Sequence, residues 1–435
     1  MSSVINPFIY GRALEPAEFH GRGQELHHLY SRLATGQSTA FIGQPHTGKT
    51  SLLKYLLDDQ IRAETFGNRF ERDLFSFLDA QKLRGVKTRA GFWERALAPL
   101  AQCLKTGKPE HLKSLDSLYR VAQKNKFGTF ELEQLFAGMS AAGTRLMLML
   151  DEFDHFLLHP VLNSAEFYGA LRSLASRSLG LVLVIAARKA LEELNQLTQK
   201  INPYGSPYFN IFTEIKLGAF SQDEISALLD RAGERFKRRD RHYITAVSGG
   251  HPYLTQAAAA TLWEAIDEGH VATARYLTAG RHLHDESKKH FADTWRLWTS
   301  ATRKVMTAVA LVQLQTTLNG PRLLLTDLFE DRDNYAPERE ELKDVGILSE
   351  GPEKEWSITQ RAFLWWFADE LRRNARDDME FKAWLQAQKM DHLIKSQERK
   401  QMWSVVKKVL AATGKGAMTL IETFAEDLAK ELKKD

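Results

Sequence analysis

Short apolar runs alternate with amphipathic segments in the first half of the chain. The runs occupy residues 38–42, 74–78, 145–150, 179–187 and 212–217. Apolar runs of this length are typical of buried strands, and the segments between them show helical spacing, as at Leu26, Leu29 and Leu33. Strands that alternate with helices favour a parallel sheet covered by helices on both faces. We therefore predict an α/β fold with a three-layer core over residues 1–220.

The pattern becomes entirely helical after Ser221. Ser221 is followed three residues later by Glu224, which is the spacing of a capping box at a helix start. Helical periodicity then continues over 222–235, 239–248 and 252–268. We interpret residues 221–297 as a helical lid that follows the core.

The remaining chain predicts two further modules. Helices are expected from Ala301, over 323–329 and over 337–345, followed by a strand, a Gly-Pro turn and a second strand over 346–358. Three helices and such a hairpin indicate a winged helix over 298–372. Residues 373–435 are helical in pattern and form a predicted helical docking tail.

Composition excludes several classes of protein. The 435 residues are 43% hydrophobic and 26% charged, which is typical of folded proteins. Because 59 basic residues nearly balance 55 acidic ones, a histone-like coat for a polyanion is excluded. Cys103 is the only cysteine and cannot form a disulfide within the chain. With no apolar run long enough for a membrane span and no visible signal segment, we expect a cytoplasmic protein.

A phosphate-binding loop follows the first strand. The motif G-x-x-x-x-G-K-[ST] is matched at every fixed position by Gly43, Gln44, Pro45, His46, Thr47, Gly48, Lys49 and Thr50. The motif lies after a strand and opens a helix, so backbone N–H groups would surround a phosphate at a helix N-terminus. We expect Lys49 to reach the β- and γ-phosphates of ATP and the Thr50 hydroxyl to coordinate Mg²⁺.

Two acidic residues end the apolar run 145–150. Asp151 is placed to hold Mg²⁺ through water, and Glu152 is placed to polarise the attacking water. A strand with a polar end is common by itself, but its combination with the phosphate-binding loop predicts a nucleotide site. Asp154 and His155 lie close by, and we expect structural or supporting roles for them.

Residues 6–370 resemble the STAND and origin-recognition-like branch of AAA+ P-loop ATPases. Besides the two nucleotide motifs, the segments 19–22, 181–188 and 248–254 look like the entry motif, the γ-phosphate sensor strand and the lid element of that branch. The resemblance implies that Arg188 senses the γ-phosphate and acts with Lys49 and Glu152 in catalysis. It further implies nucleotide contacts for the whole motif, for Ser51, and for Arg22, His251 and Pro252.

The sequence departs from this family in ways that indicate slow hydrolysis. No arginine lies between Arg188 and Phe212, where many ring-forming members carry an arginine finger. The segment 252–266 also lacks the arginine of the usual second sensor. Arg172 and Arg177 could act on a neighbouring copy, but solvated helix charges are the favoured interpretation for both.

Basic residues gather in the lid, and an apolar stripe marks the tail. The lid cluster could bind phosphates of DNA or be a solvated helix face, and it consists of Arg231, Arg235, Lys237, Arg238, Arg239 and Arg241. The third helix of the winged-helix segment is acidic, which disfavours contact with a duplex. The tail stripe includes Leu420, Ile421, Phe424 and Leu428. We interpret it as a docking surface for a separate effector or another copy, and packing back on this chain is the alternative. We expect His282 and His284 to be surface residues.

These observations favour an ATPase that works as a molecular switch. ATP and Mg²⁺ would close the lid, and the later modules would transmit that state to a protein partner, either a separate effector or another copy, in bacterial defence or signalling. One alternative is a DNA-associated ATPase of the initiator or transposition-regulator type. The other is a scaffold that keeps nucleotide bound for stability and scarcely turns it over. A membrane partner is not expected.

Overall fold

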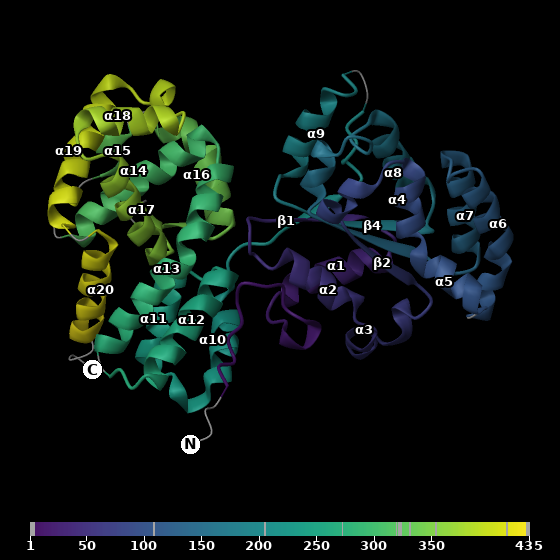
Figure 1. The fold of residues 1–435 in the computed structure, drawn as a ribbon, viewed down its shortest axis with the longest axis horizontal. Coiled ribbons are helices and arrows are strands. Elements are labelled where there is room, and N and C mark those ends of the chain that lie inside the picture. The colour runs from purple at the N-terminus through teal and green to yellow at the C-terminus, as the bar shows by residue number, and fades with distance from the viewer. Residues whose placement is uncertain are drawn as a thin grey trace. The chain divides into compact units, whose positions relative to one another are not determined.

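The computed structural model divides the chain into two compact units (Figure 1). It describes residues 5–107, 109–203, 206–271, 273–318, 320, 324–329, 332–352, 355–414 and 416–431. The N-terminal unit consists of Ala13–Gln44 and Gly48–Leu217. The C-terminal unit consists of Met1–Arg12, Pro45–Thr47 and Gly218–Asp435. Each unit is described by itself below.

A five-stranded parallel sheet forms the centre of the N-terminal unit. Its strands are β1 (Thr39–Ile42), β2 (Leu74–Asp79), β3 (Leu146–Asp151), β4 (Leu181–Ala187) and β5 (Thr213–Lys216). The order is β2-β3-β4-β1-β5, and every pair is parallel. All five predicted strands are therefore confirmed, with ends that shift by up to two residues.

Alternate residues of the strands face two separate hydrophobic cores. On β3, Leu148 and Leu150 belong to one core, whereas Met147 and Met149 belong to the other. Helices α1 and α2 cover the second core, and helices such as α4, α7 and α8 cover the first (Figure 1). Because both faces are covered, β3 and β4 are buried along their whole length, which explains their unbroken apolar runs. The three-layer core is confirmed.

The α-helices of this unit come before and between the strands. They are α1 (Gly23–Ala34), α2 (Lys49–Leu57), α3 (Asp59–Phe66), α4 (Arg89–Ala96), α5 (Ala98–Thr106), α6 (Asp116–Lys124), α7 (Thr129–Ala141), α8 (Ala165–Arg177) and α9 (Leu191–Gln199). Short 3₁₀ segments occupy Pro16–Glu18, Gly67–Phe70, Ala80–Gly85, Glu110–Leu115 and Phe153–Leu158.

The C-terminal unit is almost entirely helical. Its α-helices are α10 (Gln222–Leu229), α11 (Arg238–Ser248), α12 (Pro252–Asp267), α13 (Thr273–Leu297), α14 (Ser300–Thr317), α15 (Leu325–Leu328), α16 (Ala336–Asp344), α17 (Arg361–Asn374), α18 (Asp378–Ala387), α19 (Ser396–Ala412) and α20 (Ala417–Glu431). Its 3₁₀ segments are Asp230–Arg235, Arg332–Tyr335 and Asp391–Leu393.

The first lid helix begins and ends at identifiable residues. The Ser221 hydroxyl accepts a hydrogen bond from the Glu224 N–H, and the Glu224 carboxylate accepts one from the Ser221 N–H, so the predicted capping box is confirmed. The predicted helix over 222–235 is too long. It ends at Leu229, and Gly233 then adopts a φ of 55°, which a continuing right-handed helix does not permit.

An antiparallel hairpin follows the third helix of the segment 298–372. Strands β6 (Leu348–Glu350) and β7 (Trp356–Ile358) pair with Leu348 opposite Ile358, as the Gly-Pro turn predicts. Glu353 and Lys354 of the turn, and Leu323 of a predicted helix, lie outside the described residues. The winged-helix classification and the boundaries at 221, 298 and 373 stay predictions.

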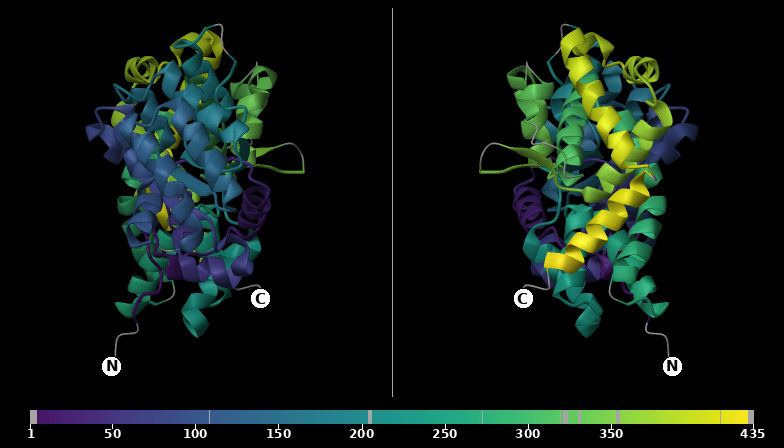
Figure 2. Two further views of the ribbon diagram at one scale, coloured as in Figure 1. Left: turned by 90° about the vertical axis from the view of Figure 1, so that its right-hand side faces the viewer. Right: turned by 90° about the vertical axis from the view of Figure 1, so that its left-hand side faces the viewer.

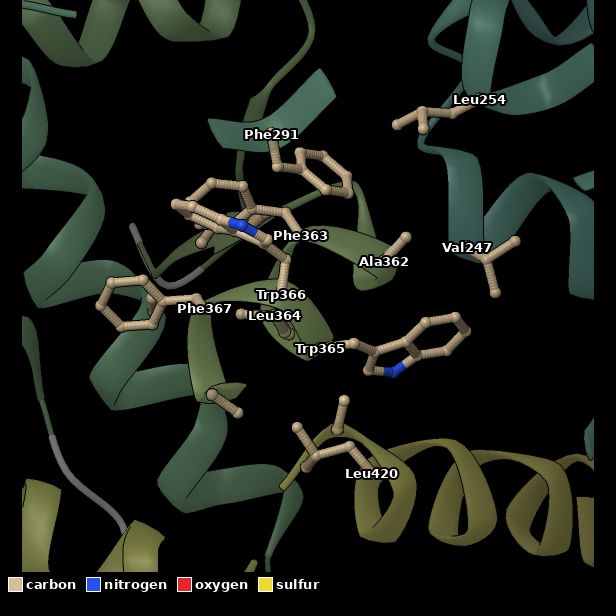
Figure 3. Packing of buried hydrophobic residues seen from close by; sticks show 14 of the residues in the cluster. Val247, Leu254, Phe291, Ala362, Phe363, Leu364, Trp365, Trp366, Phe367 and Leu420 are labelled. Carbon is tan, nitrogen blue, oxygen red and sulfur yellow. The ribbon is translucent and has the colours of Figure 1, made fainter. Parts of the chain in front are cut away.

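One continuous hydrophobic core extends through the C-terminal unit. Aromatic side chains of α17 contribute much of it, and in Figure 3 Phe363, Trp366 and Phe367 lie on the side of α17 that Phe291 of α13 approaches. A buried ion pair joins α14 to α19, because Lys304 Nζ lies 3.3 Å from the Glu398 carboxylate. The lid, the hairpin segment and the tail therefore share their interior.

The tail stripe packs on the chain's own helices. Leu420, Ile421, Phe424 and Leu428 of α20 are buried. Phe424 stacks on Tyr243 of α11, and Trp365 extends from α17 towards α20 (Figure 3). Figure 2 shows α20 running along the surface of the helices that precede it. The structure thus shows packing within the chain, which corrects the favoured interpretation of the stripe as a docking surface.

A buried histidine, His284, is connected to the start of α20 through Asp369. His284 of α13 is 4% exposed, so its prediction as a surface residue is wrong. Its Nε2 lies 2.9 Å from the Asp369 carboxylate, which also accepts the N–H of Ala417 at the start of α20. Burial alone would raise the pKa of Asp369. The hydrogen bonds with the His284 ring and with the Ala417 N–H outweigh burial and lower this pKa. Among the described residues, no helix is long and apolar enough to cross a membrane.

Candidate functional site

The glycine-rich loop connects β1 to α2 at the carboxyl edge of the sheet. Gly43 continues the strand by donating its N–H to the Ala187 carbonyl at 3.2 Å. His46 and Gly48 then take left-handed conformations, with φ of 64° and 93°. Any residue with a side chain would be strained at the φ of Gly48, which explains why a glycine precedes α2. The turn delivers Lys49 and Thr50 to the first turn of α2.

Lys49 is buried at the start of α2. Its Nζ donates to the carbonyl oxygens of Gly43 at 2.7 Å and Gln44 at 2.8 Å. Burial lowers the pKa of Lys49 to about 8, although the carboxylates of Glu152 and Asp151 oppose this effect. A buried ammonium group with only carbonyl bonds is poised to gain from an anionic ligand such as a phosphate.

The hydroxyl of Thr50 and the carboxylate of Asp151 lie together. Thr50 Oγ1 donates to Asp151 Oδ2 at 2.8 Å. Burial raises the pKa of Asp151, and the hydrogen bond from Thr50 partly offsets that rise. A hydroxyl and a carboxylate are hard oxygen ligands of the kind Mg²⁺ prefers when phosphates supply the remaining ligands. Over the described ranges, no group of three or more His, Cys, Asp or Glu side chains could hold a metal ion without such help.

Glu152 follows β3 in a left-handed conformation. Its φ is 50° and its ψ is 44°, and its N–H donates to Asp151 Oδ1 at 3.0 Å. A non-glycine residue in this region is strained and persists where surrounding contacts hold it, often at functional sites. Arg188 Nη2 lies 2.6 Å from Glu152 Oε2, and both side chains are partly exposed. The sequence did not reveal this ion pair, because it depends on β3 and β4 being neighbours in the sheet.

Two predicted site residues of the N-terminal unit, Arg22 and Ser51, contact other parts of the fold. Arg22 is 3% exposed, adopts a left-handed conformation before α1, and pairs with Glu25 at 2.9 Å. Ser51 is buried, and its hydroxyl accepts the N–H of Leu14 at 3.0 Å. The structure therefore gives both residues contacts within the fold, and their nucleotide contacts stay predictions.

The remaining predicted residues belong to the C-terminal unit. Pro252 begins α12, where its missing N–H costs no hydrogen bond. His251 precedes it, and its ring centroid lies 4.8 Å from that of His290. Pro45, His46 and Thr47 belong to the same unit, and the His46 ring lies 5.1 Å from the Tyr253 ring. These rings form an aromatic cluster, and burial lowers the pKa of His290 to about 3.

Several members of the basic lid cluster have acidic partners. Arg241 lies 2.7 Å from Asp230, and Lys237 lies 3.1 Å from Glu234. Arg235 pairs with Asp267 and covers the face of Trp263 at 4.0 Å. These ion pairs offset much of the positive charge, which favours the interpretation as a solvated helix face.

The fold and the loop geometry together define a P-loop NTPase of the AAA-like type. An AAA-like domain family matches residues 93–313, just over half of the chain, and the chain belongs to that family. The matched range begins after the glycine-rich loop, so the loop is a separate observation.

One solved structure supports the fold assignment, and two others are reported as similar chains. The Walker-type ATPase PABY2304 of Pyrococcus abyssi is similar with a TM-score of 0.50 and 15% identity, over 82% of this chain and 98% of that chain. The ORC2 protein of Aeropyrum pernix is matched with a TM-score of 0.42 and 15% identity, over 96% of this chain and 98% of that chain. A STAND protein with a tetratricopeptide repeat sensor from Pyrococcus horikoshii is matched with a TM-score of 0.32 and 13% identity. The match covers 100% of this chain and 60% of that chain. No curated protein matches the sequence.

Proposed function

We propose that this protein is an ATP-binding molecular switch that hydrolyses ATP slowly. The observation that carries the proposal is the contact between Thr50 and Asp151 beside the buried Lys49. A glycine-rich loop, a buried lysine and a hydroxyl–carboxylate pair are the parts that a P-loop ATPase needs to bind nucleotide with Mg²⁺. The AAA-like family assignment supports the same conclusion.

Each residue of the site has a chemical task in this proposal. Lys49 exchanges its carbonyl partners for the β- and γ-phosphates, which compensates the cost of its buried charge. Thr50 and Asp151 would hold Mg²⁺. When bound, Mg²⁺ supplies charge neutralisation at the β- and γ-phosphates. Glu152 orients the attacking water and accepts its proton at the carboxylate.

Slow turnover follows from the surroundings of Glu152. Its carboxylate is held by the Arg188 guanidinium at 2.6 Å, so it must leave this ion pair before it can accept a hydrogen bond from the attacking water. The sequence also offers no arginine finger between Arg188 and Phe212. A slowly reset site suits a switch, because its state lasts long enough for a partner to bind.

The partner would bind an exposed face of the C-terminal unit, since the apolar stripe of α20 is covered by the chain itself. We favour a protein partner, a second copy of the chain or a separate effector, over DNA. The ion pairs within the lid cluster support this preference. A DNA-associated ATPase would instead show binding that weakens steeply with salt and an ATPase rate that responds to duplex.

Nucleotide binding by Lys49→Ala tests the proposal. Titration calorimetry with ATP and Mg²⁺ should detect binding by the wild-type protein and none by the variant. Lys54→Ala is the matched control, because Lys54 lies in the same helix and pairs with Glu15 at 2.8 Å. Tight binding by Lys49→Ala would overturn the assignment of the site.

A further inference from the structure

His46, at the tip of the glycine-rich loop, has a left-handed backbone. Its φ is 64°, and Gly48 two residues later has a φ of 93°. Glycine adopts such a conformation without steric cost, whereas a residue with a Cβ is strained there. Left-handed residues other than glycine persist where surrounding contacts hold them. The contacts of the His46 side chain should therefore explain why the loop tolerates a histidine at this position.

The His46 ring packs on two rings of the C-terminal unit. Its centroid lies 5.1 Å from that of Tyr253 on α12 and 5.4 Å from that of His290 on α13. The centroids of Tyr253 and His290 lie 5.2 Å apart, so each of the three rings contacts the other two. Rings at these separations attract one another beyond the area that they bury. We call His46, Tyr253 and His290 the three-ring cluster.

The two partner rings of His46 are fixed by their own helices. The Tyr253 hydroxyl donates to the Glu286 carbonyl at 3.2 Å, which joins α12 to α13. His290 is 5% exposed, and burial lowers its pKa to about 3, so its ring is uncharged at neutral pH. The His46 side chain is exposed and rests on these rings. The contact is therefore ring packing, and an aromatic ring other than imidazole can supply it.

The tip of the loop belongs to the C-terminal unit. This unit contains Pro45–Thr47, whereas Gln44 and Gly48 on either side belong to the N-terminal unit. A loop of this kind binds phosphate through the directions of its backbone N–H groups. Packing that fixes the tip therefore fixes those directions before a phosphate arrives.

We propose that His46 is a positioning residue, whose packing on Tyr253 and His290 holds the glycine-rich loop in the shape that receives the phosphates of a nucleotide. This role rests on the proposed function, in which the loop binds ATP. It requires no contact between the His46 side chain and the nucleotide. A loop that is fixed in advance loses less conformational freedom on binding, so it binds phosphate more tightly.

His46→Gly and His46→Phe separate the effect of the ring from that of the backbone. Glycine removes the ring and suits the left-handed conformation, whereas phenylalanine keeps a ring at a strained φ. Titration calorimetry with ATP and Mg²⁺ should show an affinity that is lower by about fivefold or more in His46→Gly. His46→Phe should recover most of this loss. An equal loss in both variants would overturn the proposal, because it would show that the imidazole itself contacts the nucleotide.

Lys389→Gly is the matched control for the change of backbone. Lys389 is also left-handed, with a φ of 58°, and its exposed side chain lies beyond the end of α18 in the same unit. This variant should bind ATP as the wild type does. Thermal unfolding shows whether each variant is folded. If folded His46→Gly binds ATP as tightly as Lys389→Gly, the proposal is overturned.

Tyr253→Ala tests the partner ring. It should lower ATP affinity by a factor similar to that of His46→Gly, whereas Tyr253→Phe keeps the ring and should retain most of the affinity. The double variant His46→Gly/Tyr253→Ala should bind ATP little more weakly than either single variant, because both remove the same contact. Effects that add fully would overturn the proposal. If the wild type binds no ATP, the proposed function itself fails, which is a distinguishable outcome.

Discussion

Thr50 Oγ1 and Asp151 Oδ2 lie 2.8 Å apart although 101 positions separate the two residues in the sequence. Thr50 lies in the first turn of α2, and Asp151 is the last residue of β3. The fold therefore brings a hydroxyl of the loop to a carboxylate at the sheet edge, which is the arrangement that the proposed magnesium site requires.

Thr50→Val should remove the contribution of Mg²⁺ to ATP binding. Valine has nearly the same shape but no hydroxyl, so both the hydrogen bond to Asp151 and the proposed metal ligand are lost. We expect ATP affinity in Mg²⁺ to fall by about tenfold or more, towards the value measured in EDTA. Thr50→Ser keeps the hydroxyl and should retain most of the Mg²⁺ dependence. If the ATP affinity of the valine variant depends on Mg²⁺ as strongly as that of the wild type, the role of Thr50 is contradicted.

The lowered pKa of Lys49 predicts a rise of stability with alkaline pH. Burial lowers this pKa from 10.5 to about 8. Between these values the unfolded chain binds a proton that the folded protein does not, so the Lys49 contribution to the free energy of unfolding increases from pH 8 to pH 10.5. Denaturant titrations over this range should show the increase in the wild type. It should be missing in Lys49→Met and kept in Lys54→Met.

The left-handed backbone of Glu152 predicts that glycine is favoured over alanine at this position. Glu152→Gly and Glu152→Ala both lack the carboxylate and the ion pair with Arg188, but only alanine keeps a Cβ at a φ of 50°. The glycine variant should therefore be more stable by about 1 kcal/mol. Equilibrium unfolding of the two proteins measures the difference. An alanine variant of equal or greater stability would show that the conformation carries no strain.

Much of the N-terminal unit could be predicted from the sequence because its signals are local. The apolar runs of β3 and β4 are unbroken because both faces of the sheet are covered. The glycine-rich motif is recognised from the spacing of its fixed residues. The ion pair between Arg188 and Glu152 was missed because it depends on strand order, which no local pattern records. The environment of His284 was missed for a similar reason, since its partner Asp369 lies 85 residues away.

The C-terminal unit illustrates the limit of amphipathic patterns. The apolar stripe of α20 indicated that some surface must cover it, but the pattern could not show whether that surface belongs to another molecule. The structure shows that Tyr243 and Trp365 contact Phe424. Likewise, a basic cluster in sequence does not reveal the acidic partners that the fold supplies, such as Asp267 for Arg235.

Phe424→Ala should test the packing of α20. Phe424 is 6% exposed and contacts rings from two other helices, so truncation should lower the free energy of unfolding by roughly 3–5 kcal/mol. Met379→Ala provides a control, because Met379 is 76% exposed and its loss should change stability by less than about 0.5 kcal/mol. Chemical denaturation of both variants gives the comparison. A Phe424→Ala protein as stable as the control would mean that α20 does not depend on this contact.

The central claim is that Glu152 activates water in a site that Lys49, Thr50 and Asp151 assemble for ATP. The most direct measurement is phosphate release from bound ATP in a single turnover, compared between the wild type and Glu152→Gln. We predict that the wild type releases phosphate slowly, and that the variant binds ATP but releases phosphate at a rate lower by about a hundredfold or more. Equal rates of phosphate release in the two proteins would contradict the account.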